Sequence, residues 1–362
     1  MRVDLALIGF GNVGRRFARL LDELRPRVLA DWDLETRVVA IATRTHGAAF
    51  EAGGIDITDA LARVESGQRL AGSLDSAGRA GDARDLILMM RQSEAALRVM
   101  IETTTLDVGA GQPAIDHVTT ALDSGCHAVT ANKGPVAFAY PALQDRARTA
   151  GLSFLFEGAV MDGVPIFNLV RETLPAVNIL GFRGVVNSTT NHILTALEDG
   201  EEFEPALARM QADGIAEADA SLDVDGWDAA AKAAALANVL MDAGITPHAV
   251  VRTGIGPQSA ERARAAKARG ERLRLVARAE RDTSGSVRAS VQLTELAAGD
   301  LLASLRGTAN ALVFRTDLLG EIAMCQLEGS LTQTAYALLS DLITVRRRHP
   351  QAPEAAPARR NP

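Results

Sequence analysis

The sequence predicts an α/β protein in which a domain built on a parallel sheet is followed by an α+β domain. Three observations indicate this order. An apolar strand at the amino terminus runs directly into a glycine-rich turn and a helix. Strand and helix patterns then alternate to about residue 135, as in parallel sheets whose strands are joined by helical crossovers. Beyond about residue 150, strands and helices follow one another without regular alternation.

The first strand, turn and helix predict a dinucleotide site. Val3–Leu7 is an apolar run typical of a buried strand, and the segment after the turn carries apolar residues at helical spacing. Gly9 permits the tight turn, Gly11 allows the backbone to approach a pyrophosphate, and Gly14 allows the helix to pack closely on the strand. Unpaired N–H groups at the start of the helix favour phosphate binding. We therefore expect a cofactor to contact the whole turn, which consists of Gly9, Phe10, Gly11, Asn12, Val13 and Gly14.

The end of the second predicted strand, residues 36–42, bears on the choice of dinucleotide. Enzymes that use NAD usually place an acid there to bind the ribose hydroxyls. This chain instead has Arg44 between two threonines, and a guanidinium suits a 2′-phosphate. The sequence therefore favours NADP and leaves NAD open.

The strands at 98–102 and 127–130, separated by a helix at 113–124, end in polar residues. Thr104 follows the first of these strands and Lys133 follows the second. Ligands of doubly wound sheets lie beyond the carboxyl ends of the strands. We expect Thr104 and Lys133 to lie where cofactor and substrate meet.

The remaining elements predict the second domain. Strands are expected at 153–156, 177–186, 272–280, 286–294, 309–316 and 321–327. One helix should end near residue 173, and residues 187–192 carry hydroxyls and amides that can cap another. A closing helix is expected at 332–345, followed by a disordered tail at 347–362 that is rich in proline and alanine.

An acidic segment at 214–232 leads into an alanine-rich helix that should start near residues 225–226. Asp228 and Lys232 are four residues apart and therefore share one face of that helix. Such pairs are usually solvated surface ion pairs. Here they follow several other carboxylates, among them Glu217 and Asp223, which suits a small zwitterionic substrate.

Composition excludes several other classes of function. The 362 residues are enough for two domains, and the net charge of −7 argues against nucleic-acid partners and anionic membranes. Two cysteines are too few for a disulfide framework and favour a reducing compartment, so we expect a cytoplasmic protein. The most apolar stretch, 229–245, contains Lys232 and Asp242 and predicts a buried helix instead of a membrane span.

The chain resembles the homoserine dehydrogenases over nearly its whole length. The resemblance is carried, in order, by GFGNVG at 9–14, TANKGPVA at 130–137, GVVNSTTNHILT at 184–195, GIAEADASLDVDGWDAAAK at 214–232 and ASLRGTANALVFRTDLLGEI at 303–322. It implies a Rossmann nucleotide-binding domain, assigned here to 1–150 and 306–346. It also implies a mixed-sheet catalytic and dimerisation domain at 151–305. The implied reaction is the NAD(P)-dependent interconversion of L-homoserine and L-aspartate 4-semialdehyde, in threonine and methionine biosynthesis.

The resemblance also implies roles for individual residues. Glu217, Asp223, Asp228 and Thr189 would bind the substrate, and Lys232, Lys133 and Asp228 would act in catalysis. Glu157 and the main chain at Val160 would bind a structural sodium ion. A homodimer is implied as well. Because little sequence follows residue 346, we expect no regulatory domain of the kind many relatives carry.

Hydride transfer builds negative charge on the carbonyl oxygen of the semialdehyde, and a proton must arrive there. Lys232 or Lys133 can supply both the positive charge and the proton. We expect Lys232 to be the donor, with its pKa lowered by burial next to a second cation.

Some positions depart from the family's pattern and keep other hypotheses open. Asp162 and Ser188 stand where the family usually has glycine, which raises the possibility of a different hydroxy- or amino-alcohol substrate. A non-catalytic NADP-binding sensor is a further alternative. A thioester-forming semialdehyde dehydrogenase would need a reactive thiol with a histidine base. Cys126, at the start of a strand with His127 next to it, is poorly placed for that chemistry.

Overall fold

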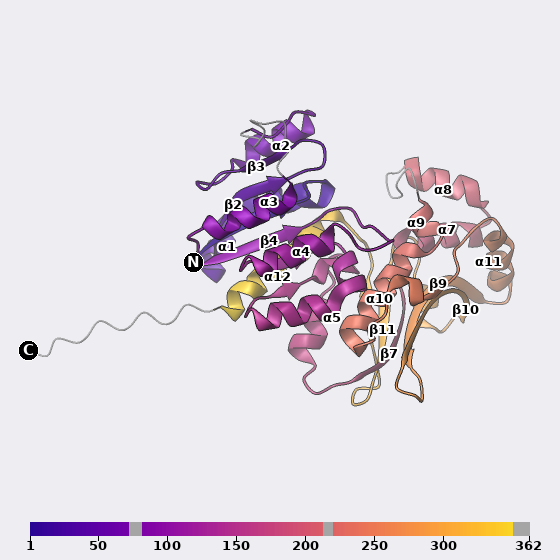
Figure 1. Ribbon diagram of the computed structural model, residues 1–362. Helices are drawn as coiled ribbons and strands as arrows, with labels where there is room; N and C mark the ends of the chain where they lie inside the picture. The colour runs from indigo at the N-terminus through magenta and orange to yellow at the C-terminus, as the bar shows by residue number, and fades with distance from the viewer. Residues whose placement is uncertain (72–81, 213–219, 350–362) are drawn as a thin grey trace, which may run out of the picture.

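Two sheets organise the chain in the computed structural model, which describes residues 1–71, 82–212 and 220–349 (Figure 1). The first sheet has the strand order β3-β2-β1-β4-β5-β6. Its strands are parallel except for β3, which pairs antiparallel with β2. They are β1 (Arg2–Ile8), β2 (Glu35–Ala42), β3 (Ala48–Phe50), β4 (Leu97–Glu102), β5 (His127–Thr130) and β6 (Phe154–Leu155). The parallel, doubly wound sheet predicted from the sequence is confirmed.

Helices pack against both faces of this sheet. On one face, α1 and α12 contact each other and share an apolar core with the strands. The opposite face carries α3, α4 and α5, which pack side by side in that order. The helices of this part of the molecule are α1 (Asn12–Trp32), α2 (Ile57–Glu65), α3 (Ala83–Met89), α4 (Ala114–Asp123), α5 (Gly134–Thr149) and α12 (Leu331–Arg348).

Strand β1 lies between β2 and β4 in the first sheet. The chain continues from β1 to β2 on one side, and β4 later pairs with β1 on the other side. The strand order therefore reverses between β1 and β4, and the crevice of a doubly wound sheet opens at such a point. The glycine turn follows β1 at this position, and Thr103 follows β4. This topology places the predicted cofactor turn at the switch point.

The second sheet is mixed and has the order β12-β11-β7-β9-β10-β8. All of its pairings are antiparallel except that of β10 with β8. The strands are β7 (Ile179–Val185), β8 (Val251–Arg252), β9 (Glu271–Arg281), β10 (Val287–Ala297), β11 (Asn310–Thr316) and β12 (Glu321–Gln326). The helices around it are α6 (Ile166–Asn168), α7 (Ser188–Glu198), α8 (Phe203–Ala212), α9 (Ser221–Val224), α10 (Trp227–Met241) and α11 (Gln258–Ala268).

Helix α10 is held between the two halves of the molecule. Its alanines are buried almost without exception, because small side chains let the helix approach α5 on one side and strands β9 and β10 on the other. One apolar core runs from the first sheet through α5 and α10 into the second sheet. The start of α10, which carries Asp228, is thereby fixed relative to the end of β5.

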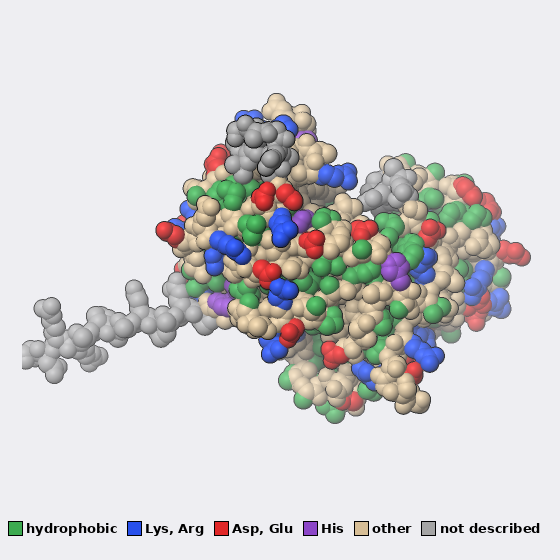
Figure 2. All heavy atoms as spheres, in the orientation of Figure 1, with side chains coloured by type: hydrophobic (Ala, Val, Ile, Leu, Met, Phe, Trp, Pro, Cys, Tyr) green, Lys and Arg blue, Asp and Glu red, His purple; other side chains and the backbone are tan. Residues whose placement is uncertain are grey.

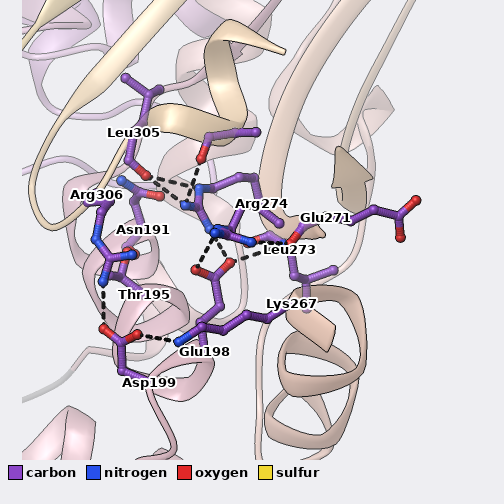
Figure 3. A network of polar contacts seen from close by, with 12 residues as sticks. Asn191, Thr195, Glu198, Asp199, Lys267, Glu271, Leu273, Arg274, Leu305 and Arg306 are labelled. Carbon is purple, nitrogen blue, oxygen red and sulfur yellow. Dashed lines mark hydrogen bonds and ion pairs between the residues drawn. The ribbon is translucent and has the colours of Figure 1, made fainter. Parts of the chain in front are cut away.

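A buried ion pair joins α7 to the second sheet. Glu198 near the end of α7 and Arg274 on β9 are both fully buried, with Oε1 and Nη1 separated by 2.6 Å (Figure 3). The remaining guanidinium N–H groups of Arg274 donate to the main-chain oxygens of Ala303 and Leu305. Figure 3 shows the Leu305 carbonyl reaching the guanidinium from the segment that precedes β11.

Two boundaries differ from the sequence-based expectation. Residues 306–346 were expected to return as a block to the nucleotide-binding domain, but β11 and β12 hydrogen-bond into the second sheet, and only α12 packs on α1. The tail was expected to begin at 347, whereas α12 continues through Arg348. The division at 150–151 stays a prediction.

The surface carries interspersed charges. Acidic and basic side chains alternate over the face seen in Figure 2, without a broad area of one sign. Among the described residues, no helix combines the length and apolar character needed to cross a membrane.

Candidate active site

The three glycines of the first turn differ in their surroundings, as a pyrophosphate site requires. Gly9 has φ +92°, and a Cβ there would lie 2.6 Å from the carbonyl carbon of Thr103. A Cβ on Gly14 would lie 2.5 Å from the oxygen of Gly9, so only glycine lets α1 approach the turn. Gly11 has no atom within 4 Å of the corresponding point. The turn is closed where helix and strand meet and open where a phosphate would approach, which fits a dinucleotide.

Helix α1 begins at Asn12 without a side-chain cap on its first N–H groups. Those donors are therefore free of protein side-chain acceptors at the end where the helix dipole favours an anion. Phe10 is buried beneath the turn, and the Asn12 side chain accepts a hydrogen bond from Arg15 over 2.8 Å. The turn predicted from the sequence is thus formed by the residues expected.

A buried carboxylate that the sequence analysis did not identify holds Thr104 in place. Glu102, at the end of β4, accepts hydrogen bonds from the Thr104 main chain (3.1 Å) and hydroxyl, and from the Thr130 hydroxyl (3.0 Å). Asn132, just before Lys133, donates to the oxygen of Thr104 over 3.0 Å. The ends of β4 and β5 are therefore joined by polar contacts. An acid directly after the apolar run Val99–Ile101, at the carboxyl end of a strand, was the available signal for Glu102.

Arg44 is exposed in the turn after β2. Thr43 closes this turn, because its hydroxyl donates to the oxygen of Gly47 over 2.9 Å and accepts from the main chain of His46 over 2.7 Å. The turn presents the Arg44 side chain to solvent beyond the strand end.

Asp228 lies between two lysines. One carboxylate oxygen is 3.0 Å from Nζ of Lys133, and the other is 3.0 Å from Nζ of Lys232. Helix α10 begins at Trp227 after Gly226, whose φ of +78° turns the chain into the helix. Asp228 and Lys232 follow on one face, as the four-residue spacing predicts, and Lys133 arrives from the start of α5. The structure therefore brings together the three residues expected to act in catalysis.

Asn187, the N-cap of α7, organises the acids around this cluster and was not identified from the sequence. Its amide donates to Asp223 over 2.7 Å and to Asp228 over 2.9 Å, while its Oδ1 accepts from the main chain of Thr190. The neighbouring carbonyl of Val186 accepts a 2.7 Å hydrogen bond from Nζ of Lys232. One helix start thus fixes both acids and the lysine.

The charges of the cluster shift its pKa values in opposite directions. Burial would raise the pKa of the Asp228 carboxyl, but Lys133 and Lys232 lower it well below its usual range. Burial and the charge of Asp228 raise the pKa of the Asp223 carboxyl, although Asn187, Lys232 and Thr189 oppose that shift. Asp228 therefore remains ionised between the two lysines.

The expected lowering of the Lys232 pKa is wrong for this structure. Burial does act in that direction, but the carboxylates of Asp228, Asp162 and Asp223 outweigh it and raise the pKa of the ammonium. The surrounding acids therefore decide the direction of the shift against both the burial and the second cation.

The structure describes some, but not all, of the substrate-binding residues that the resemblance implies. Thr189 is buried on the first turn of α7, and Asp223 lies on α9 beside Asn187. Glu217 falls outside the described residues.

Two buried carboxylates meet where a sodium ion was expected. Glu157 accepts main-chain hydrogen bonds from Phe167 (2.8 Å) and Asn168 (2.7 Å), and its own N–H donates to Asp341 over 2.8 Å. Burial and then the charge of Asp341 raise the pKa of Glu157 to about 8, and burial raises that of Asp341 to about 6. The other oxygen of Asp341 is buried and accepts no hydrogen bond from the described residues. Among the described residues, no three His, Cys, Asp or Glu side chains cluster as metal ligands.

Cys126 and His127 do not form a nucleophilic pair. Burial raises the pKa of the Cys126 thiol to about 11 and lowers that of His127 to about 3. The His127 ring accepts a hydrogen bond from the main chain of Ser153 over 3.0 Å. A neutral buried thiol at the amino end of β5 cannot attack a substrate at the carboxyl end. The structure thus gives no support to a thioester mechanism.

Comparison with known proteins identifies the family. The family model for homoserine dehydrogenase matches residues 165–343, and the model for the homoserine dehydrogenase NAD-binding domain matches residues 9–157. An NAD(+)-dependent homoserine dehydrogenase of Pseudomonas canavaninivorans is 34% identical over 94% of this chain and 95% of its own. A homoserine dehydrogenase of Methanocaldococcus jannaschii is 34% identical over 95% and 98%, respectively. A hyperthermophilic archaeal homoserine dehydrogenase solved with NADPH superposes with a TM-score of 0.75 at 28% identity, covering 97% of this chain and 99% of that one. The chain belongs to the homoserine dehydrogenase family.

Proposed function

We propose that the Lys133–Asp228–Lys232 cluster catalyses the interconversion of L-homoserine and L-aspartate 4-semialdehyde. Membership of the family makes the chain an NAD(P)-dependent oxidoreductase that acts on a small amino-acid substrate. The observation that carries the assignment of residues is the pair of 3.0 Å contacts by which Asp228 holds both lysines near the carboxyl ends of the parallel strands.

When bound, the nicotinamide accepts the hydride from C4 of homoserine or returns it to the semialdehyde. In the reductive direction, negative charge grows on the C4 oxygen as the hydride arrives. The Lys232 ammonium stabilises that charge and transfers a proton to the oxygen, and in oxidation the neutral amine takes the hydroxyl proton back. Asp228 orients Lys232, and Lys133 adds positive charge from the side of the nucleotide-binding part.

The acids next to the cluster suit the other end of the substrate. Asp223, with Thr189 close by, offers negative charge to the substrate's α-ammonium. The resemblance adds Glu217 to this group. A hydroxy acid without the amino group would leave the partly buried carboxylate of Asp223 without this partner, which is costly, so the site should discriminate against it.

A substrate panel tests this proposal. Absorbance of the reduced nicotinamide is followed with L-homoserine, 4-hydroxybutyrate and 4-amino-1-butanol, with each cofactor. L-Homoserine should be oxidised with the highest kcat/KM. Preference for one of the other alcohols would establish a different substrate, and cofactor binding without any turnover would favour the sensor alternative.

Arg44 supports NADP as the preferred cofactor, although relatives are named or solved with either dinucleotide. We expect Arg44→Ala to raise KM for NADP about 10- to 100-fold, because a charged hydrogen bond to phosphate contributes about 1.5–3 kcal/mol. KM for NAD should change less than about twofold by the same argument, since NAD has no 2′-phosphate. Arg27→Ala, on the exposed face of α1, is the matched control. An equal effect on both cofactors would contradict a role of Arg44 in binding the 2′-phosphate.

A sodium ion at Glu157 and the main chain of Val160 is the second cofactor that we propose. The unpartnered buried oxygen of Asp341 and the raised pKa values support it, because a cation would stabilise both carboxylates. The ion would have a structural role, since Glu157 fixes the start of α6.

The acid pair predicts an unusual dependence of stability on pH. The folded pKa of Glu157, about 8, lies above its ordinary value of 4.5, so the folded protein binds the proton more tightly than the unfolded chain. Without sodium, the free energy of unfolding should fall as pH rises from about 4.5 toward 8, by a few kcal/mol at about 1.4 kcal/mol per pKa unit. Urea denaturation in choline chloride should show this slope, and Glu157→Gln should flatten it. Sodium chloride should restore stability at pH 8 in the wild type only. An identical slope in Glu157→Gln would contradict the assignment of this pH dependence to Glu157. The control is Glu51→Gln, at an exposed glutamate.

The homodimer is proposed from the second sheet. β12 is an edge strand, and apolar side chains around it are exposed, including Leu327 (78%) and Tyr336 (53%). A groove of about 990 Å³ runs between β12, the start of α12 and residues 163–165. Light scattering after gel filtration should give twice the mass of 38.2 kDa, and a monomer at micromolar concentration would contradict the proposal.

A further inference from the structure

Asp162 lies at a junction of three segments. It follows Met161 in the loop between β6 and α6, with φ +47°, and its side chain is half-buried. Gln326 at the end of β12 donates to Oδ2 over 2.8 Å, and Thr334 on α12 donates to Oδ1 over 2.9 Å. Both partners are neutral, and the described residues contribute no salt bridge to this carboxylate. The carboxylate therefore joins this loop to β12 and α12 through hydrogen bonds from neutral side chains.

The hydrogen bonds of Asp162 continue to the start of α7, next to the residue that holds the catalytic acids. The Gln326 side chain accepts from Asn310 over 3.3 Å, and Asn310 donates to the Ser188 hydroxyl over 2.8 Å. Ser188 is the first residue of α7 and follows Asn187, whose amide holds Asp223 and Asp228. Asp162 and Ser188, two positions that depart from the family's usual glycine, are thus the ends of one chain of contacts.

The same carboxylate anchors the return of the chain to the nucleotide-binding part. Thr334 lies in the first turn of α12, and the neighbouring Thr332 accepts a 2.9 Å hydrogen bond from Arg16 on α1. A Cβ at Gly329 would lie 2.8 Å from Oδ2 of Asp162, so the segment 326–334 wraps closely around the carboxylate. Asp162 therefore contacts the edge strand β12 of the second sheet and helix α12, which in turn packs on α1.

The negative charge of Asp162 also acts on the charged cluster. Burial lowers the pKa of the Lys232 ammonium, but the carboxylates of Asp228, Asp162 and Asp223 together raise it. These acids come from the loop before α6, from α10 and from α9, while Lys133 approaches from α5 through Asp228.

We propose that Asp162 is a positioning residue for the reaction. Its side chain fixes the segment 326–334 against the start of α7, and so aligns the cofactor-binding part with the Lys232–Asp228 pair. The proposal rests on the function proposed above. Through Gln326 and Ser188, its carboxylate sets the position of the start of α7. Through its charge, it acts on the Lys232 ammonium. It does not need to touch the reacting atoms.

Asp162→Asn isolates the charge, because asparagine tolerates a positive φ as well as aspartate does. Asp162→Gly keeps the backbone conformation and removes all contacts. We expect both variants to lower kcat for L-homoserine oxidation about 10- to 100-fold, the loss that a misalignment of about 1 Å can cause. KM for the dinucleotide should change less than about threefold, since the glycine turn is untouched. Asp317→Asn is the matched control, because its carboxylate also accepts from a neutral amide, that of Asn178, at the far end of the β12 hairpin.

Two readouts separate positioning from a purely structural role. Loss of the negative charge in Asp162→Asn should move the lysine limb of the pH–rate profile to lower pH, since the Lys232 ammonium then releases its proton more easily. Ser188→Ala should lower kcat in the same manner, and the double variant should lose less than the product of the single losses, because both act through one chain of contacts. If Asp162→Asn fails to fold, Asp162→Gly carries the pH profile, because it also removes the charge, and Ser188→Ala carries the loss of kcat.

A melting temperature that falls while kcat and the pH profile stay at wild-type values would overturn the inference. So would losses in the two single variants that simply multiply in the double variant. Wild-type protein that binds cofactor but does not oxidise L-homoserine would overturn the proposed function first, and this inference with it.

Discussion

Replacement of Lys232 by alanine is expected to lower kcat for L-homoserine oxidation about 10²- to 10⁴-fold, the usual contribution of a positioned acid–base group. The lysine is held by Asp228 at 3.0 Å and by the carbonyl of Val186 at 2.7 Å, so its ammonium has a single orientation. Alanine removes both the positive charge and the proton donor. The dissociation constant of the dinucleotide, measured by fluorescence titration, should stay within about twofold because the glycine turn is unchanged.

Lys267→Ala is the matched control for this substitution. Lys267 forms an exposed ion pair with Asp199 and lies in α11, outside the cluster. Its loss should leave kcat unchanged. Lys133→Ala should also lower turnover, with a larger effect on the binding of substrate and cofactor than Lys232→Ala has. Wild-type turnover in Lys232→Ala would contradict the proposed roles of both lysines.

The largest effect on stability is expected for Arg274→Met. Arg274 and Glu198 are fully buried, and the substitution would leave the Glu198 carboxylate with only its longer, 3.8 Å ion pair to Arg272. Breaking a buried pair by removing one partner typically costs about 3–5 kcal/mol. The carbonyls of Ala303 and Leu305 would also lose their donors. Urea denaturation should show a loss of at least about 3 kcal/mol in the free energy of unfolding.

Two comparisons make this prediction specific. The double variant Glu198→Gln/Arg274→Met should be less destabilised than the sum of the single losses, because the second change removes the unpaired charge. Arg306→Met breaks only an exposed contact with Asp199 and should cost at most about 1 kcal/mol. Equal losses in Arg306→Met and Arg274→Met would show that burial of the pair does not decide its contribution.

Local sequence patterns sufficed to predict the parts of the site that lie within one element. The glycine turn follows from the demands of one strand–helix junction, and the Asp228–Lys232 pair follows from the four-residue spacing on α10. Lys133 and Thr104 were expected together because parallel strands end at one edge of a sheet.

Such local patterns could not predict contacts between segments that lie far apart in the sequence. The bridge from Asn187 to Asp223 and Asp228 spans about forty residues and depends on how α7 is placed against α10. The pairing of β11 with β7 was missed for the same reason, since an alternating pattern predicts a strand but not the sheet it joins. The raised pKa of Lys232 depends on Asp162, seventy residues earlier in the chain.

A crystal structure of the protein with NADP and L-homoserine would test the central claim most directly. We expect Nζ of Lys232 to lie within hydrogen-bond distance, about 2.6–3.2 Å, of the C4 hydroxyl oxygen, while C4 faces the nicotinamide. A complex in which the Lys232 ammonium stays bound to Asp228 and Val186 alone, with the hydroxyl turned toward another donor, would contradict it.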